Sequence, residues 1–254
     1  MKLMSKTPLT IGILGGMGPE ATALFFYKII KLTPAKFDQE HLKIIIYNNP
    51  QVPDRTEAIL NRTTDKLIAE IKEGILFLDR AKVNIIVIPC VTVHYFFEKI
   101  KCFTNIPILN IIEETTLYIQ NNYPKINKVG LLATTGTIKS KIFHKMLYSK
   151  NFQLIVPDEK NQVKLMESIY GNKGIKSGNA DKYTKQRIIR LAYDLIEKGA
   201  EVIIGGCTEI PLLISHKDLP VPFVDPLTVL AQAVIVKAGL IPKVIDNVNL
   251  TETY

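Results

Sequence analysis

Two cysteines follow similar apolar runs at matched points of the sequence. Cys90 comes after Asn84–Pro89, and Cys207 comes after Glu201–Gly206, 117 positions further on. A side chain that follows a strand of a doubly wound α/β sheet lies where such sheets bind their ligands. We predict that each cysteine also opens the next helix, where the partial positive charge of the helix N-terminus favours a thiolate.

Two thiols that face each other across a cleft suit one kind of reaction. One thiolate can take a proton from one face of a carbon atom while the other thiol returns a proton to the opposite face, and the roles exchange in the reverse direction. The pair therefore indicates a cofactor-independent racemase or epimerase. A disulfide switch, a metal site and two small buried side chains are the alternatives.

Other thiol and imidazole groups do not extend this pair into a metal site. Cys90 and His94 are four positions apart, but the neighbours of Cys207 supply no matching histidine, so we expect no metal. We expect His94 to be a helix-surface or packing residue. Cys102 has no partner in the repeat and follows the presumed helix Thr92–Lys101, so we expect it to be structural.

An arginine in a turn-rich loop is a candidate for substrate recognition. Arg55 ends the loop Asn48–Arg55, whose prolines restrict its shape, and an arginine can bind a carboxylate through two parallel hydrogen bonds. The alternative is a surface arginine paired with Asp54 or Glu57. On composition alone, Lys176 is an ordinary exposed lysine of the loop Gly171–Gly178.

A glycine-rich loop follows the first predicted strand. Gly16, Gly18 and Ala21 match the G-x-G-x-x-A pattern of dinucleotide sites, but Asp38 precedes the second strand instead of ending it. The glycines can equally form an anion-binding loop at a helix N-terminus. Thr134–Thr137 occupies the corresponding place in the second segment, where it can bind an anion or cap a helix.

The elements that carry these residues alternate along the whole chain. Short β-branched runs are separated by amphipathic stretches such as Thr184–Lys198, which predicts an α/β protein with a mostly parallel sheet. The runs before the two cysteines repeat, so we expect two similar domains that present equivalent strand ends to each other. The predicted strands are Thr10–Leu14, Leu42–Tyr47, Val83–Pro89, Ile106–Leu109, Lys128–Ala133, Phe152–Val156, Glu201–Gly205 and Val221–Val224.

The composition and charge of the chain exclude several classes of protein. The chain has 254 residues, of which 47% are hydrophobic and 22% charged, as in ordinary globular proteins. No apolar run approaches the roughly 18 residues of a membrane span. Leu9–Leu14 breaks at two glycines without a cleavage pattern, and three cysteines are too few for a disulfide framework, so we expect a cytoplasmic protein. The net charge of +8 is scattered and comes with no binding motif, so we expect no nucleic-acid partner.

Taken together, the motifs resemble the aspartate/glutamate racemase superfamily, and within it the aspartate racemase branch. The resemblance covers nearly the whole chain. Glutamate racemases carry Asp-Ser in the first loop and His after Cys-Thr, where this chain has Gly15-Gly16 and Glu209. The motifs that carry the resemblance are Gly15–Thr22, Pro53–Arg55, Pro89–His94, Leu132–Thr137 and Gly206–Pro211.

The resemblance implies racemisation of L- and D-aspartate without pyridoxal phosphate or any other cofactor. It implies Cys90 and Cys207 as the catalytic acid/base pair in a cleft between two pseudo-symmetric α/β domains, formed by residues 1–105 with 219–254 and by residues 106–218. Arg55 and Lys176 match the cations that bind the substrate's side-chain carboxylate. The further substrate-binding candidates are Met17, Gln51, Thr92, Thr135, Thr137, Thr208 and Glu209. A homodimer is also implied.

One position departs from the family pattern. The family has Cys-Asn-Thr after the third strand, and the asparagine helps to hold the substrate's α-carboxylate, whereas this chain has Val91. Loss of one charge-assisted contact costs roughly 1.5 to 3 kcal/mol, or about 10- to 150-fold in binding or rate. The alternatives are therefore a racemase for glutamate or for many amino acids, and a catalytically weak relative that binds an amino acid.

Overall fold

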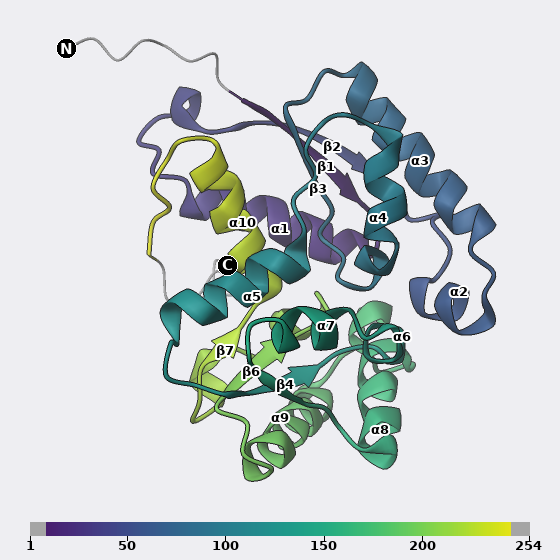
Figure 1. Ribbon diagram of the computed structural model, residues 1–254, viewed down its shortest axis with the longest axis vertical. Coiled ribbons are helices and arrows are strands. Elements are labelled where there is room, and N and C mark those ends of the chain that lie inside the picture. The colour runs from purple at the N-terminus through teal and green to yellow at the C-terminus, as the bar shows by residue number, and fades with distance from the viewer. Residues whose placement is uncertain (1–8, 245–254) are drawn as a thin grey trace.

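The computed structural model describes residues 9–244, and its first parallel sheet carries the N-terminal part of the chain (Figure 1). The predicted first domain extends beyond the described residues at both ends. The sheet has the order β2-β1-β3, and Ile108 adds a single parallel bridge to Ile86 at the β3 edge. Its strands are β1 (Thr10–Gly15), β2 (Lys43–Asn48) and β3 (Ile85–Val87).

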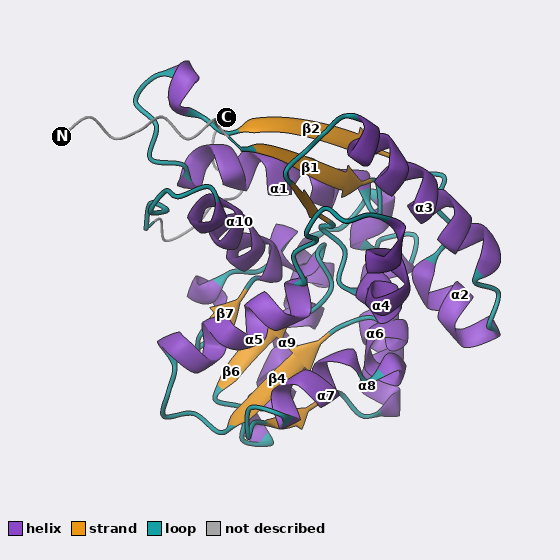
Figure 2. Cartoon of the chain, turned by 45° about the horizontal axis from the view of Figure 1, so that its top comes forward, coloured by secondary structure: helices purple, strands orange, loops and turns teal. Residues whose placement is uncertain are grey.

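The second sheet repeats the arrangement of the first. It is parallel and has the order β5-β4-β6-β7 (Figure 2). In this order β4 corresponds to β1, β6 to β3, and β7 to the segment around Ile108, so the predicted internal repeat and the predicted α/β fold class are confirmed. The strands are β4 (Lys128–Leu132), β5 (Gln153–Ile155), β6 (Val202–Gly205) and β7 (Phe223–Val224).

Helices begin where the sequence offers capping side chains. Asp54, Asn110, Thr134, Asp181 and Asp225 each accept a hydrogen bond from a backbone N–H of the helix that follows. Among the described residues, no helix is both long and apolar enough to cross a bilayer. The helices are α1 (Pro19–Leu32), α2 (Arg55–Asn61), α3 (Asp65–Arg80), α4 (Phe97–Ile100), α5 (Ile111–Asn122), α6 (Thr135–Ser140), α7 (Ile142–Tyr148), α8 (Glu159–Tyr170), α9 (Lys182–Glu197) and α10 (Pro226–Lys237).

Two segments at the predicted domain boundaries lie differently from expectation. Ile106–Leu109 was expected to open the second domain, but the bridge from Ile108 to Ile86 places it beside the first sheet. Phe223–Val224 was assigned to the first domain, but it pairs with β6 in the second sheet. At both crossings the chain adds an edge strand to the sheet it is leaving before it passes to the other one.

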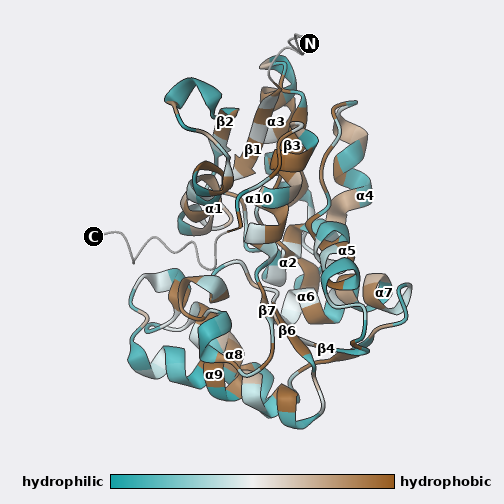
Figure 3. Cartoon of the chain, turned by 90° about the vertical axis from the view of Figure 1, so that its left-hand side faces the viewer, coloured by the Kyte–Doolittle hydropathy of each residue, from teal (hydrophilic) through white to brown (hydrophobic). Residues whose placement is uncertain are grey.

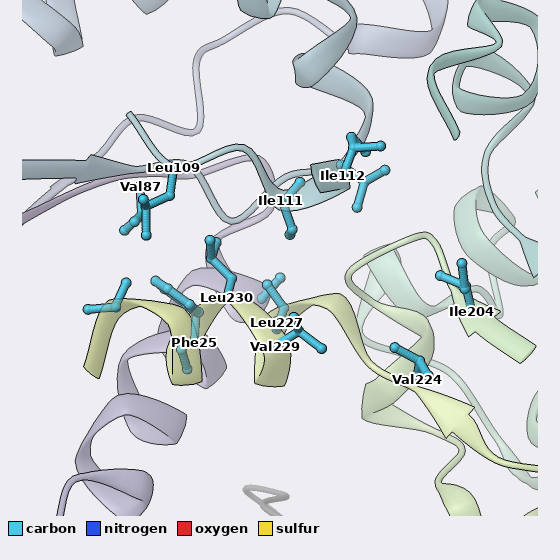
Figure 4. Close-up of a cluster of buried hydrophobic side chains, with 14 of the residues drawn as sticks. Phe25, Val87, Leu109, Ile111, Ile112, Ile204, Val224, Leu227, Val229 and Leu230 are labelled. Atoms are coloured by element: carbon cyan, nitrogen blue, oxygen red, sulfur yellow. The ribbon is translucent and has the colours of Figure 1, made fainter. Parts of the chain in front are cut away.

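Both sheets turn one face toward a shared apolar core. Successive strand residues alternate between faces, so Ile11 and Ile13 enter this core while Leu14 packs against α3 on the other side. In the second sheet Val202 and Ile204 enter the shared core, and Ile203 packs with residues of α8 and α9. One continuous cluster therefore contains residues of both sheets, as Figure 4 illustrates for Val87 and Ile204.

Helix α10 fills the space between the two sheets. It packs against α1 and α5, and its buried residues include Leu227, Leu230, Ala231 and Val234. In Figure 3 it contrasts with the largely hydrophilic outer helices α8 and α9. A helix that is apolar on most of its surface is stable only when surrounded by protein, so its burial holds the two sheets together.

A buried ion pair fixes the start of α10. Asp225 accepts hydrogen bonds from the backbone N–H groups of Leu227 and Thr228, and its carboxylate lies 3.1 Å from the ammonium of Lys28 on α1. The Lys28 side chain is only 3% exposed, and it has further interactions within the protein, so the ion pair with Asp225 lies in the interior.

Asp225→Ala is expected to lower the free energy of unfolding by about 2 to 4 kcal/mol, because it removes a helix cap and one partner of a buried charge. Urea unfolding followed by circular dichroism measures the change. Asp225→Asn keeps a capping oxygen and serves as the control for the ion pair alone. If Asp225→Ala unfolds at the wild-type urea concentration, the pair does not anchor α10.

Candidate functional site

A small cavity lies where the carboxyl ends of strands from both sheets meet. Its empty volume, which includes space open to solvent, is about 220 Å³. Most of the predicted site residues line it, and three residues outside the predicted set, Val91, Thr134 and Tyr170, join them. The lining residues are Met17, Arg55, Cys90, Val91, Thr92, Thr134, Tyr170, Lys176, Cys207, Thr208 and Glu209.

The two predicted catalytic cysteines reach this cavity from equivalent strands. Cys90 follows β3 and Cys207 follows β6, and each is 5% exposed with its thiol free of any disulfide. Parallel strands end at the same edge of their sheet, and the two sheets present these edges to each other. The sequence repeat therefore places two thiols in the lining of one cavity.

Contrary to expectation, no α-helix begins at either cysteine. Cys90 precedes a 3₁₀ turn, Thr92–Phe96, and the four-residue helix α4, while Cys207 precedes the 3₁₀ turn Ile210–Leu212. The run after Cys90 is rich in β-branched and aromatic residues, which are poor formers of a regular α-helix. A helix dipole therefore does not favour the thiolate at either cysteine.

Glu209 determines the charge environment of Cys207. The thiol of Cys207 donates a hydrogen bond to Glu209 Oε2 at 2.9 Å, and Thr208 Oγ1 donates to the same oxygen at 3.1 Å. Burial first, and then the charge of Glu209, raise the pKa of the Cys207 thiol well above its ordinary value, against the opposing charge of Lys176. Cys207 is therefore a neutral thiol at rest.

Lys176 and Glu209 form a buried ion pair across the cavity wall. The ammonium of Lys176 donates a hydrogen bond to Glu209 Oε1, and the two side chains are 19% and 4% exposed. Burial alone would raise the pKa of Glu209, but the charge of Lys176 and hydrogen bonds from Cys207, Lys176 and Thr208 hold it below its ordinary value. Lys176, which looked like an exposed surface lysine by composition, is thus half-buried and paired.

Arg55 begins α2 and points inward. Its Nη1 donates hydrogen bonds to the carbonyl oxygens of Val52 at 3.3 Å and Pro53 at 3.2 Å, and its Nη2 donates to the carbonyl of Met17 at 3.3 Å. Its buried Nε has no hydrogen-bond partner in the described part of the chain. Burial would lower the pKa of Arg55, but the nearby charges of Cys90 and Asp54 outweigh it and raise the pKa.

The surface alternative for Arg55 is therefore wrong. The residue is only 8% exposed, and Asp54, its proposed surface partner, instead accepts a hydrogen bond from the backbone N–H of Glu57 as the cap of α2. A guanidinium that is charged, buried and short of one partner is suited to binding an anion in the cavity.

A cluster of threonines joins the two domains at the inner wall of the cavity. Thr92 Oγ1 lies 3.1 Å from Thr134 Oγ1 and 2.9 Å from Thr137 Oγ1. Thr137 is fully buried behind this wall and does not line the cavity, contrary to prediction. Thr134, which caps α6, takes its place.

Two other predicted substrate-binding residues point elsewhere. Thr135 Oγ1 accepts a hydrogen bond from Gln162 Nε2 at 3.1 Å on α8, so its hydroxyl faces away from the cavity. Gln51 is exposed on the loop after β2, and its backbone N–H donates to Asn49 Oδ1. Both lie within a motif that reaches the cavity, but the turn geometry directs their side chains outward.

Tyr170 lines the cavity although the sequence motifs do not predict it. It is the last residue of α8, and its hydroxyl donates a hydrogen bond to Asp54 Oδ2 at 2.9 Å. The ammonium of Lys176 lies 5.6 Å from the centre of its ring. Tyr170 follows no strand and belongs to no motif, so nothing in its local sequence indicated a place in the site.

His94 supports Cys90 from behind. The backbone N–H of Ile111 donates to His94 Nε2 at 3.4 Å, so Nδ1 carries the proton and donates to the carbonyl of Cys90 at 2.8 Å. Burial lowers the pKa of His94 to about 4, and the predicted packing role is confirmed. Cys102, expected to be structural, is instead exposed. Residues 9–244 contain no group of three or more side chains able to hold a metal ion.

The glycine loop packs against protein atoms of both domains. Gly16 has a φ of +97°, and a Cβ atom there would come within 2.3 Å of the Asn49 backbone. A Cβ atom on Gly18 would lie 3.2 Å from Glu209 Oε1. Asp38 lies in a separate 3₁₀ turn before β2. The glycines allow the loop to pack closely on Asn49 and on the Lys176–Glu209 pair. Because protein atoms occupy the space beside them, the loop does not favour a dinucleotide site.

Glu209→Gln is expected to lower the pKa of Cys207, because it removes the negative charge and leaves that of Lys176. The measurement is the pH at which iodoacetamide alkylates Cys207 at half its maximal rate, followed by peptide mass spectrometry. Exposed Cys102 in the same molecule is the control and should keep its midpoint. A Cys207 midpoint that stays or rises would show that Glu209 does not govern the thiol.

Comparison with known proteins agrees with this geometry. A broad-specificity amino-acid racemase of Bacillus subtilis is 30% identical over 229 residues, which cover 89% of this chain and 96% of that protein. The aspartate racemase of Picrophilus torridus is similar in structure, with a TM-score of 0.82 and 30% identity over 92% of this chain and 96% of that one. An aspartate racemase homologue of Pyrococcus horikoshii has a TM-score of 0.73 and 26% identity, over 91% and 99% of the two chains.

The family model described as Asp/Glu/hydantoin racemase matches residues 14–234, which include both cysteines, Arg55 and the Lys176–Glu209 pair. The match spans both sheets and the helix between them. With two parallel sheets of the same order and a cavity where their strand ends meet, the chain belongs to the Asp/Glu/hydantoin racemase family.

Proposed function

We propose that this amino-acid racemase interconverts L- and D-aspartate, with Cys90 and Cys207 as its two acid/base residues. One observation supports this most strongly: two free, buried thiols from equivalent strands line a single small cavity. An α-carbon held between them presents one face to each sulfur atom. Transfer of a proton from one face to the other inverts the configuration without a cofactor.

The proton moves in a balanced pair of steps. In the direction that starts with Cys207 protonated, the thiolate of Cys90 takes the α-proton and the Cys207 thiol gives its proton to the opposite face. Cys90 then carries a thiol and Cys207 a thiolate, ready for the reverse reaction. Glu209 holds the Cys207 proton by hydrogen bonding and does not take it, because a carboxylate with a lowered pKa is a weak base.

Cations make this proton acidic enough to remove. The α-proton of an amino acid is a weak acid, so the site must stabilise negative charge that develops on the α-carbon and carboxylate. Arg55 remains charged within the cavity and has a buried Nε without a partner among the described residues. Lys176 partly offsets the charge of Glu209, which limits the cost of a thiolate on Cys207.

Turnover of a wider range of amino acids is the second candidate. Val91 lines the cavity with an apolar side chain at the position where the family pattern has asparagine. The relative from Bacillus subtilis is named for broad specificity. Incubation of the protein with a panel of L-amino acids in D₂O tests this, because loss of the α-proton NMR signal identifies each substrate. Turnover confined to aspartate would reject the broad range.

If no amino acid of the panel loses its α-proton signal, the result would favour a third candidate, a relative that binds an amino acid without turning it over. Calorimetry with L- and D-aspartate would then detect binding. The homodimer and the cytoplasmic location expected from the sequence stay predictions, and light scattering on the purified protein measures the first.

Cys90→Ala and Cys207→Ala are each expected to slow racemisation of aspartate by about 100-fold or more, because each removes one of the two proton carriers. Chiral chromatography of L- and D-aspartate measures the loss. In D₂O each variant should exchange the α-proton of at most one enantiomer, and the two variants should differ in which one. The cause is that the remaining sulfur atom faces only one side of the α-carbon.

The control for these variants is Cys102→Ala, which removes an exposed thiol that does not line the cavity and should keep turnover within about twofold of the wild type. Undiminished racemisation by Cys207→Ala would reject the two-thiol mechanism.

Arg55→Lys is expected to reduce kcat/KM for aspartate by about 10- to 150-fold, because lysine keeps the charge but cannot bind a carboxylate through two parallel bonds. Turnover of alanine, which has no side-chain carboxylate, should fall by much less. Steady-state rates on the two substrates make the comparison. Equal losses on both would contradict the assignment of Arg55 to the side-chain carboxylate.

A further inference from the structure

Tyr170 connects the two domains at the outer rim of the cavity. It lines the cavity, yet it is 38% exposed, whereas Cys90, Cys207, Arg55 and Glu209 are buried. Its hydroxyl reaches Asp54 of the first domain from the end of α8 in the second domain. The hydrogen bond therefore crosses from one domain to the other where the cavity meets solvent.

We propose that Tyr170 is a positioning residue that latches the two domains together and fixes the spacing of Arg55 and Lys176 across the cavity. The proposal rests on the proposed function only in that these two cations are taken to bind the substrate. The latch itself is a property of the fold and can be measured without turnover.

Each end of the tyrosine side chain contacts one of the two cationic segments. Its hydroxyl binds Asp54, the residue that caps α2, and α2 begins at Arg55. Its ring lies beneath the ammonium of Lys176, at a distance within the range of cation–π attraction. A shift of Tyr170 would therefore move the start of α2 and the Lys176 side chain relative to each other.

The hydroxyl remains a donor at any pH at which the protein works. Burial first, and then the neighbouring acidic groups of Cys207 and Asp54, raise the pKa of Tyr170 above its ordinary value. Asp54 can accept because its other oxygen, Oδ1, binds the backbone N–H of Glu57 while Oδ2 faces Tyr170. The Asp54 carboxylate thus caps α2 and also accepts the hydrogen bond from Tyr170.

The other contacts between the domains near the cavity are of a different kind. Thr92, Thr134 and Thr137 are bonded to one another in the buried inner wall. α2 also packs closely on α6, since a Cβ atom on Gly136 would come within 2.9 Å of the Thr56 Cα. These contacts cannot open without exposing the core. The Tyr170–Asp54 bond can open into solvent, which makes it the contact that controls entry to the cavity.

Alkylation of the cavity cysteines tests the latch directly. Tyr170→Phe keeps the ring under Lys176 and removes only the hydroxyl. We expect iodoacetamide to modify Cys90 and Cys207 about three- to tenfold faster than in the wild type, as loss of one hydrogen bond to a carboxylate would allow. Cys102, which is exposed in the same chain, is the internal reference and should react at an unchanged rate.

Matched variants separate the latch from a general loosening of the fold. Tyr148→Phe removes the hydroxyl of a side chain that is 83% exposed on α7 and should leave all three cysteine rates unchanged. In a protein that already carries Asp54→Ala, Tyr170→Phe should add less than about twofold, because the partner of the hydroxyl is gone. Unchanged rates for Cys90 and Cys207 in Tyr170→Phe, or a full additional effect in the Asp54→Ala protein, would overturn the proposal.

Kinetics provide a second readout. Tyr170→Phe should raise KM for aspartate about three- to tenfold and leave kcat within about twofold, because bound substrate restores the closed spacing. A fall in kcat with unchanged KM would reject the positioning role. If the wild-type protein lacks racemase activity but the alkylation rates rise as expected, the proposed substrate is wrong and the latch stands.

Discussion

The burial of α10 between the two sheets is the constraint on which the rest of the structure depends. Both sheets place one face in the apolar cluster that surrounds this helix, and α1 and α5 complete its enclosure. Because burial of apolar surface is the main driving force of folding, the shared cluster fixes the sheets relative to each other. The carboxyl ends of β3 and β6 then converge, and the cavity is a consequence of that packing.

The two domains repeat in backbone but differ in charge. β3 and β6 occupy equivalent places in their sheets and each leads to a cysteine. Arg55 lies near Cys90, whereas Glu209 is hydrogen-bonded to Cys207 and paired with Lys176. Burying an ion pair is costly unless its remaining polar atoms are satisfied, and here Thr208 and Cys207 satisfy Glu209. A symmetric scaffold thus holds two thiols in unlike electrostatic surroundings, as the proposed pair of acid and base requires.

The contacts between the domains differ between the inner wall and the outer rim of the cavity. The threonine cluster and the close approach of Gly136 to Thr56 form a buried, tightly packed wall. Tyr170 and Asp54 meet at the solvent side through one hydrogen bond. In the proposed mechanism, proton transfer needs the cysteines to be placed to within fractions of an ångström, and they lie on the side of the tightly packed wall.

The sequence by itself determined the strands, their repetition and the placement of both cysteines, because alternating apolar residues and strand-end positions are local properties of the chain. It also indicated Arg55 and the glycine loop. Only the tertiary structure decided that 3₁₀ turns follow the cysteines, that Glu209 pairs with Lys176, that Thr135 turns away and that Tyr170 enters the site. These features depend on contacts between residues far apart in the chain. Such contacts are set by how the two sheets pack, and the hydrophobic periodicity of a short segment does not indicate them.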